Sequence, residues 1–184
     1  DMSDASRAIK DSERKMCAQN NVKEITEIKI GYDGIVIANN VKSEQFNLTK
    51  TQLFLALARK IPVNGKLIDN SYKNWSDIDK SLPETKIEVY GPPPTSGTRD
   101  AFVEMVMDEA CEEIKEYVSA YPDKKERKQS CQLIREDGVY IEAGENDNLI
   151  VQKLESNPDA LGIFGYSFLE ENSNKIQGSL INGV

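Results

Sequence analysis

The 184-residue sequence contains no histidine. Histidine is the side chain most often used as a general base near neutral pH, and it is the commonest protein ligand of transition metals. Carboxylates clustered at metal-ligand spacing are also missing from the sequence. A serine or threonine nucleophile needs a neighbouring base or a metal ion. We therefore expect no catalytic residue, no metal site and no cofactor.

Positive charge and long apolar runs are scarce as well. The sequence has 23 lysines and arginines against 31 acidic residues, which gives a net charge of −8. Nucleic acid is therefore not an expected partner, because binding its phosphate backbone requires a basic face. No stretch approaches the roughly 18 apolar residues that a membrane-spanning helix needs. A small anion is not excluded, since donors within about 3 Å hold a buried ion whereas salt screens surface charges beyond roughly 10 Å.

Cysteine is present at only three positions. Cys111 and Cys131 flank a turn at residues 121–125 that folds one predicted helix back along the next. Their spacing suits a disulfide in an oxidising compartment, with about 3 kcal/mol of stabilisation, and two buried free thiols are the alternative. Cys17 is left over, either as a free thiol or as a thiol whose partner lies in a missing segment.

The stretch Ser96-Gly97-Thr98-Arg99 is the strongest local signal in the sequence. An extended run at residues 86–90 and three prolines lead into it, and apolar residues spaced by three and four then predict a helix from Gly97 to about Ser119. Free backbone N–H groups, the helix dipole, two hydroxyls and a guanidinium would meet at this turn. Such a set of donors is suited to hold an anion.

The alternative for this turn is an ordinary helix cap, in which Ser96 only satisfies a backbone N–H group. Two neighbours favour the anion site. Gly97 lets a ligand approach the backbone closely, and Arg99 is poorly placed in a first helical turn unless a negative charge meets it.

Apolar periodicity predicts an alternation of strands and helices along the chain. The strands are expected at residues 24–32, 35–38, 86–90, 139–142 and 161–166. This order indicates an α/β fold with mostly parallel sheets, in which ligands bind beyond the carboxyl ends of the strands. The glycine-containing loops around Gly97 and Gly144 both lie at such strand-to-helix turns.

The stretch Ser96–Phe102 resembles the phosphate-binding turn of the periplasmic phosphate-binding proteins that serve ABC phosphate importers, the PstS type. Five other stretches resemble the same family in the same order, so that the resemblance covers nearly the whole chain: Ala5–Arg7, Ile30–Asn39, Asn74–Ile78, Gly144–Asn148 and Asn157–Tyr166.

This resemblance implies a type II periplasmic-binding-protein-like fold, with two α/β lobes and a ligand cleft between them. On that basis we expect a partial first lobe at residues 1–88, a second lobe at 89–171 and a partial return segment at 172–184. The family begins with a further strand and a loop that also touches phosphate, and it continues beyond residue 184. We therefore expect the isolated chain to respond only weakly to phosphate.

The function implied by the resemblance is to bind inorganic phosphate and deliver it to the membrane permease of an ABC importer, with no chemistry on the ligand. The protein would be a monomer exported to the periplasm, and its signal peptide is absent from this chain. The alternatives are binding of sulfate or molybdate, or a protein-interaction lobe that has lost ligand binding. A phosphatase that uses Ser96 or Thr98 is disfavoured by the missing base.

The resemblance also implies a set of ligand residues. The turn contributes Ser96, Gly97, Thr98 and Arg99, and the facing lobe contributes Ser6 and Arg7. Many relatives carry an acidic residue at the position of Arg7, where it accepts a proton from phosphate. Arg7 departs from that pattern, which weakens any expectation that this protein rejects fully deprotonated anions such as sulfate.

Two further positions, Arg135 and Asn146, are candidate members of the site. Relatives often have an arginine shortly before Ser-Gly-Thr, where this sequence has prolines, and Arg135 is the candidate replacement. The alternative for Arg135 is an ion pair with Glu136 or Asp137. Asn146 either reaches the ligand or caps its own helix. Asp100 and Glu145 would repel an anion unless they point away or are neutralised.

Overall fold

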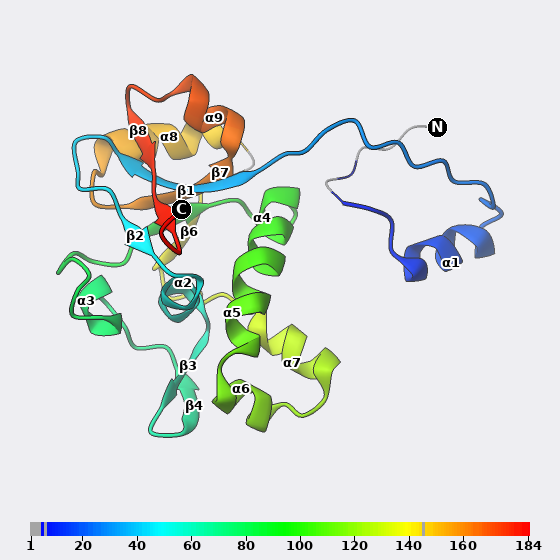
Figure 1. Ribbon diagram of the computed structural model, residues 1–184, viewed down its shortest axis with the longest axis horizontal. Helices are drawn as coiled ribbons and strands as arrows, with labels where there is room; N and C mark the ends of the chain where they lie inside the picture. The colour runs from blue at the N-terminus through cyan, green and yellow to red at the C-terminus, as the bar shows by residue number, and fades with distance from the viewer. Residues whose placement is uncertain (1–4, 6, 145) are drawn as a thin grey trace. The chain divides into compact units, whose positions relative to one another are not determined.

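The computed structural model describes residues 5, 7–144 and 146–184 (Figure 1). Contacts within the chain divide it into two units, Asp1–Gly34 and Ile35–Val184. Strands from before and after residue 88 share one sheet. The lobe boundaries expected at residues 88 and 171 stay a prediction.

The described part of the first unit contains one helix, α1 (Asp11–Gln19), none of whose residues is buried. The predicted strand at residues 24–32 is wrong, because residues 22–34 form neither helix nor strand. Of the three isoleucines that suggested it, Ile25 is partly buried, whereas Ile28 and Ile30 are 75% and 94% exposed. Alternating apolar residues form a strand only beside another strand that pairs with their backbone, and the described part of this unit supplies none.

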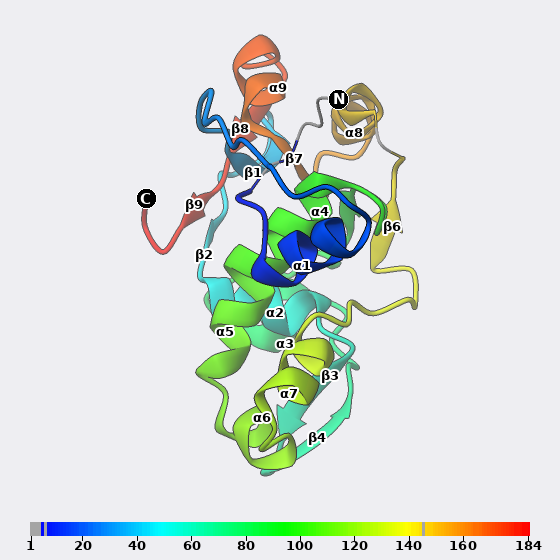
Figure 2. The same cartoon turned by 90° about the vertical axis from the view of Figure 1, so that its right-hand side faces the viewer.

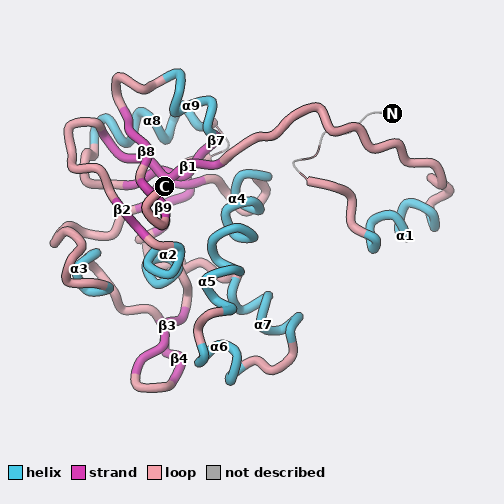
Figure 3. Tube along the Cα trace, in the orientation of Figure 1, coloured by secondary structure: helices cyan, strands magenta, loops and turns pink. Residues whose placement is uncertain are grey.

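The second unit contains a five-stranded sheet in the order β6-β5-β7-β1-β8. Figure 3 draws the strands of this unit in magenta. Strand β5 is parallel to both β6 and β7, and β1 is antiparallel to both β7 and β8. Four of the strands therefore run in one direction and β1 opposes them. The strands are β1 (Ile35–Asn40), β5 (Val89–Gly91), β6 (Tyr140–Glu142), β7 (Leu161–Gly165) and β8 (Ile176–Gly178).

Both faces of this sheet are covered, which is why its strands are apolar without strict alternation. Successive residues of a strand point to opposite faces, so Ile163 belongs to one buried cluster and Phe164 to the other. The first cluster includes residues of α2 (Lys50–Leu57) and α4 (Gly97–Phe102), and the second includes residues of α8 (Asp147–Ser156). The second unit is therefore a layered α/β domain, seen from two sides in Figures 1 and 2.

Smaller elements complete the second unit. They are β2 (Asn47–Leu48), which pairs with β9 (Leu180–Ile181), the hairpin of β3 (Lys60–Val63) and β4 (Lys66–Asp69), and the short helices α3 (Trp75–Ile78) and α9 (Tyr166–Glu171). The hairpin turns at Asn64–Gly65, where both residues have positive φ. No helix in the described ranges is both long and apolar enough to cross a membrane.

The helix predicted from Gly97 to about Ser119 is interrupted. Helix α4 continues into a π-helical segment, η1 (Val103–Asp108), and then into α5 (Glu109–Glu112). The backbone becomes extended at Ile114 before α6 (Lys115–Ala120) begins. The break lets Tyr117 donate a hydrogen bond to the Lys60 carbonyl at 2.8 Å, and tertiary contact here overrides local periodicity.

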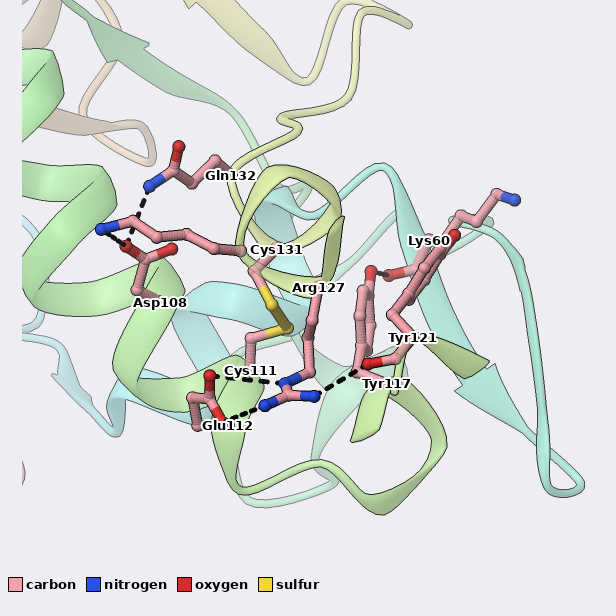
Figure 4. Close-up of a disulfide and its surroundings, with 10 residues drawn as sticks. Lys60, Asp108, Cys111, Glu112, Tyr117, Tyr121, Arg127, Cys131 and Gln132 are labelled. Carbon is pink, nitrogen blue, oxygen red and sulfur yellow. Dashed lines mark hydrogen bonds and ion pairs between the residues drawn. A yellow bond between two sulfur atoms is a disulfide. The ribbon is translucent and has the colours of Figure 1, made fainter. Parts of the chain in front are cut away.

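The predicted disulfide is confirmed. Cys111 and Cys131, at the end of α7 (Lys124–Cys131), are bonded with a Cα–Cα distance of 5.7 Å (Figure 4). Both residues are buried, and Cys17 is a free thiol. Arg127 adds an ion pair across the same helix pair, with Nη2 lying 3.3 Å from Glu112. The bridge therefore ties α7 to the end of the helical run that starts at the Ser96 turn.

Candidate functional site

The carboxyl ends of β5, β6 and β7 lie at one edge of the sheet, because β5 is parallel to both of its neighbours. The loop after β5 leads to Ser96, and the loop after β6 leads to Asn146. At the end of β7, the backbone N–H of Gly165 donates to Asp147 at 3.1 Å, which joins this strand to the start of α8. The two predicted anion loops thus leave the same edge, where α/β sheets bind ligands.

Ser96 is the N-cap of α4. Its hydroxyl accepts a hydrogen bond from the Thr98 N–H at 3.2 Å, and its carbonyl accepts from the Asp100 N–H at 3.2 Å. The helical backbone runs on without a break through η1 and α5, since the residues at both junctions keep right-handed helical angles. The capping role that the sequence left open is therefore present. This cap leaves the backbone N–H of Gly97 without an intrahelical acceptor, and Gly97 is exposed in the first turn.

Arg99 lies beside this turn and is half-buried. Its Nη1 donates to the Pro92 carbonyl at 3.3 Å, and its guanidinium carbon lies 4.5 Å from the centre of the Tyr140 ring. Arg99 and Arg135 line the same hollow of about 250 Å³, together with Pro94, Ile134, Glu136, Tyr140 and Glu142. The structure thus brings two of the three predicted arginines to one hollow, although two carboxylates also line it.

Arg135 is only 3% exposed, and its guanidinium is fully engaged. It binds both carboxylate oxygens of Asp137, with Nε to Oδ1 at 2.8 Å, and it donates to the carbonyls of Ala56, Asn70 and Tyr72. These five bonds match the five N–H donors of an arginine. The hydrogen bonds from Arg135 lower the pKa of Asp137. The ion pair with Asp137, the alternative to ligand binding, is the arrangement that the structure has.

Asn146 is the N-cap of α8, where its side-chain oxygen accepts from the Asn148 N–H at 3.1 Å. Gly144, two residues before it, has a φ of +82°, which side chains other than glycine rarely allow. Asp100 is exposed, and Glu145 lies outside the described residues. The helix-capping alternative for Asn146 is therefore the observed contact.

The two predicted ligands in the first unit have different outcomes. Ser6 lies outside the described residues. Arg7 forms a two-pronged ion pair with Glu13, with nitrogen–oxygen distances of 2.7 and 3.0 Å. Hydrogen bonds from Arg7, and then from the Lys10 N–H, lower the pKa of Glu13 to about 2. Arg7 therefore neutralises a carboxylate inside its own unit.

Sequence analysis missed Tyr140 and Gly91. Tyr140 is 7% exposed, and its hydroxyl donates to the Pro92 carbonyl at 2.7 Å. Burial raises the pKa of Tyr140, and the nearby charge of Arg99 opposes that shift. A Cβ atom on Gly91 would lie 2.2 Å from the Tyr140 hydroxyl oxygen. The only signal in the sequence was a glycine at the end of an extended run before three prolines.

Within the described ranges, no group of three or more Cys, Asp or Glu residues is placed to hold a metal ion. The candidate site is therefore built from a capped helix start, hydroxyls and one half-buried guanidinium. Such donors bind an anion, and a nucleophile among them would have no histidine to activate it.

A family model for the PBP superfamily domain matches residues 1–182. The chain belongs to the PBP superfamily. This confirms the expected family and fold class, a periplasmic-binding-protein-like α/β architecture with a mostly parallel central sheet.

Curated relatives named phosphate-binding protein PstS match 96% of the chain. One from Staphylococcus haemolyticus is 32% identical and one from Staphylococcus epidermidis is 34% identical, each over 179 residues. The chain spans 44% and 43% of the length of these two relatives.

Solved structures show the same fold. The chain aligns with PstS from Borrelia burgdorferi at a TM-score of 0.59 and 16% identity, covering 97% of this chain and 56% of that one. It aligns with a Clostridium perfringens protein crystallised with bound phosphate at a TM-score of 0.59 and 20% identity, covering 98% and 55%.

Proposed function

We propose that this chain binds inorganic phosphate, as part of a solute receptor that delivers phosphate to the membrane permease of an ABC importer. The observation that carries the proposal is the turn Ser96–Arg99, which starts a helix at the carboxyl end of β5 and has a half-buried arginine beside it. The relatives named PstS and the neighbour crystallised with phosphate support the same ligand. The receptor binds and releases phosphate and does no chemistry on it.

Phosphate near neutral pH has one to two negative charges and four oxygens, so it needs several converging donors. The N–H of Gly97, the hydroxyls of Ser96 and Thr98, and the guanidinium of Arg99 form the proposed core of the site. The bond to Pro92 uses one of the five N–H groups of Arg99, and the others serve the anion.

Ser6, Arg7 and Asn146 are further candidate members of the proposed set. Arg7 would have to exchange its bond to Glu13 for the ligand. Asn146 would donate to the ligand through its side-chain NH₂ group, while its side-chain oxygen continues to cap α8. For Arg135 to bind the anion as well, it would have to exchange one of its five bonds to Asp137 and three carbonyls for the ligand.

The proposal includes export and a monomeric state. The buried disulfide between Cys111 and Cys131 suits an oxidising compartment outside the cytosol. The relatives named PstS support the role of a receptor for an ABC importer, and the permease is the proposed protein partner.

Titration followed by amide NMR tests the ligand directly, because it detects weak binding in the chain as it stands. We expect phosphate, up to about 10 mM, to shift the amide signals of Gly97, Thr98 and Arg99. Sulfate and molybdate are run in parallel. Unshifted signals with all three anions would overturn the proposal. Larger shifts with sulfate than with phosphate would indicate that sulfate, and not phosphate, is the ligand.

Arg99→Ala tests the proposed core. We expect it to weaken phosphate binding by roughly 2–4 kcal/mol, about 30-fold to 1,000-fold, because it removes a charge-assisted contact to a desolvated anion. Arg99→Lys recovers part of the loss, since a point charge does not reproduce the fork of donors. Thr98→Val costs about 1–2 kcal/mol. Arg59→Ala is the matched control, because it removes the same charge from an exposed residue that does not line this hollow.

A further inference from the structure

Arg99 and Tyr140 share one hydrogen-bond acceptor, the carbonyl of Pro92. The Arg99 Nη1 donates to it at 3.3 Å and the Tyr140 hydroxyl at 2.7 Å. The guanidinium also lies 4.5 Å from the centre of the Tyr140 ring, within the range of a cation–π contact. Two different contacts therefore fix the guanidinium, one at its edge and one at its face.

The Tyr140 ring reaches this position only because residue 91 is glycine. A Cβ atom there would lie 2.2, 2.6 and 2.8 Å from three atoms of the Tyr140 side chain. Distances below 3.0 Å do not occur for real Cβ atoms, and Tyr140 is held by burial as well as by its hydroxyl. Gly91 pairs with Glu142 of the neighbouring parallel strand, and it thus makes space for Tyr140 of that strand.

Two carboxylates make such support necessary. Glu136 and Glu142 line the same hollow as Arg99. A free arginine side chain has several rotatable bonds and would pair with the nearest carboxylate, which would remove its donors from an incoming anion. In the structure, the guanidinium instead lies on the Tyr140 ring and bonds to Pro92.

We propose that Tyr140 is a positioning residue of the anion site, which holds the Arg99 guanidinium open toward the ligand and away from Glu136 and Glu142, and that Gly91 is required to admit it. This inference rests on the proposed function for its consequence, but its geometry is testable without any ligand. Tyr140 itself contacts Arg99 and not the anion.

The ligand-free test is the NMR signal of the Arg99 side chain. A ring beneath the guanidinium shields the Arg99 Hδ and Hε protons, so their signals should lie upfield and show NOEs to the Tyr140 ring in the unchanged protein. Tyr140→Phe keeps the ring and should keep the shift, whereas Tyr140→Leu should abolish it. Unshifted Arg99 signals without NOEs in the unchanged protein would overturn the inference, whether or not phosphate binds.

The second test measures phosphate affinity. Tyr140→Leu should weaken binding by roughly 3-fold to 30-fold, the range expected for losing a cation–π contact, and Tyr140→Phe should restore most of it. In an Arg99→Ala background, Tyr140→Leu should cause no further loss, because there is no guanidinium left to position. An equal loss in both backgrounds would show that Tyr140 acts only through the hydrophobic packing of the domain and not through Arg99. Tyr90→Phe is the control, since it removes a hydroxyl bonded to Glu88 from the neighbouring strand.

Gly91→Ala provides an independent variant of the same contact. It should displace the Tyr140 ring and reproduce both the altered Arg99 signals and the weaker binding of Tyr140→Leu. When it is combined with Tyr140→Leu, which removes the clashing ring atoms, Gly91→Ala should weaken phosphate binding by less than about 3-fold more. Normal Arg99 signals in a folded Gly91→Ala protein would contradict the claim that this glycine admits the ring. If the signals behave as expected while phosphate never binds, the positioning stands and the proposed function fails.

Discussion

Residues 1–34 and residues 35–184 contain the same kinds of apolar side chain in opposite environments. Ile30 is 94% exposed, whereas Ile37 and Ile163 are 5% and 0% exposed and face each other across paired strands. Among the described residues, the first unit has one helix with no buried residue, and the second has two buried clusters on the two faces of its sheet. Apolar alternation therefore becomes structure only where neighbouring backbone and side chains complete it.

The same contrast divides the candidate site. The Ser96 turn, Arg99 and Tyr140 lie in the packed unit, where burial and hydrogen bonds fix their positions. Arg7 lies in the first unit, whose described residues belong to neither buried cluster, and it forms an ion pair with Glu13 near the start of α1.

The largest expected difference is in amide hydrogen exchange. Residues 22–34 form no described strand, so we expect their amides to exchange almost as fast as in an unfolded chain. Paired amides of β1 and β7 should be protected roughly 10³-fold or more, because exposing them requires opening the domain. Exchange followed by mass spectrometry on fragments checks this. Strong protection across residues 24–32 would show that this segment pairs with a strand in solution.

Core truncation should separate the two units next most strongly. Ile163→Ala should lower the free energy of unfolding by about 2–5 kcal/mol, because it leaves a cavity in a fully buried site. Ile30→Ala, its matched control, should change it by less than about 0.5 kcal/mol. Urea unfolding monitored by the buried Trp75 gives both values. Similar losses from the two variants would mean that Ile30 is buried in solution.

Removing the disulfide should have a slightly smaller effect. Cys111→Ala combined with Cys131→Ala should lower the free energy of unfolding by about 3 kcal/mol, because it releases a cross-link between residues 20 apart in sequence. Cys17→Ala in the first unit should have almost no effect on the same transition. Melting curves measure both. An unchanged melting temperature in the double variant would show that packing alone fixes α7 against α5.

The smallest effect concerns two carboxylates. The pKa of Glu13 is lowered from 4.5 to about 2 by hydrogen bonds from Arg7, and that of Asp137 is lowered from 3.8 by hydrogen bonds from Arg135. A lowered folded-state pKa favours the ionised form, so each pair stabilises its unit above the unfolded pKa and loses this as the pH falls through the folded pKa. For Glu13 the loss falls between about pH 4.5 and 2.

Carbon-13 NMR of the two carboxyl groups from neutral to acid pH measures these values. Arg7→Gln should return the pKa of Glu13 toward 4.5 while leaving that of Asp137 unchanged. A pKa near 4.5 for Glu13 in the unchanged protein would show that the ion pair with Arg7 does not persist, and the first unit would then have even less fixed structure.

Several features of the fold and site were predictable because they depend on local chemistry. Thr49 starts α2 as a capping residue, Asn64–Gly65 forms the hairpin turn, and the Ser96 turn starts a helix. The disulfide followed from the spacing of Cys111 and Cys131 around a turn. In each case, the residues that make the interaction are close in sequence, so the pattern alone specified them.

Other features depended on residues that are distant in sequence. The interruption of the long helix at Ile114 accompanies the contact of Tyr117 with Lys60, 57 positions earlier. The role of Arg135 was set by the carbonyls of Asn70 and Tyr72, more than 60 positions away. The support of Arg99 by Tyr140 required β5 and β6 to be neighbours. No local pattern carries this information.

The sequence by itself determined the α/β alternation and the helix starts, because each arises from spacing and backbone preference within a short stretch. It also predicted the disulfide, and it led to the proposal that the Ser96 turn binds an anion. Only the tertiary structure decided that residues 24–32 have no partner strand among the described residues. It also decided that all five N–H donors of Arg135 bond to the protein, and that Tyr140, admitted by Gly91, lies against Arg99. Those outcomes depend on which backbone groups and rings meet in space, and that is fixed by strand order and packing.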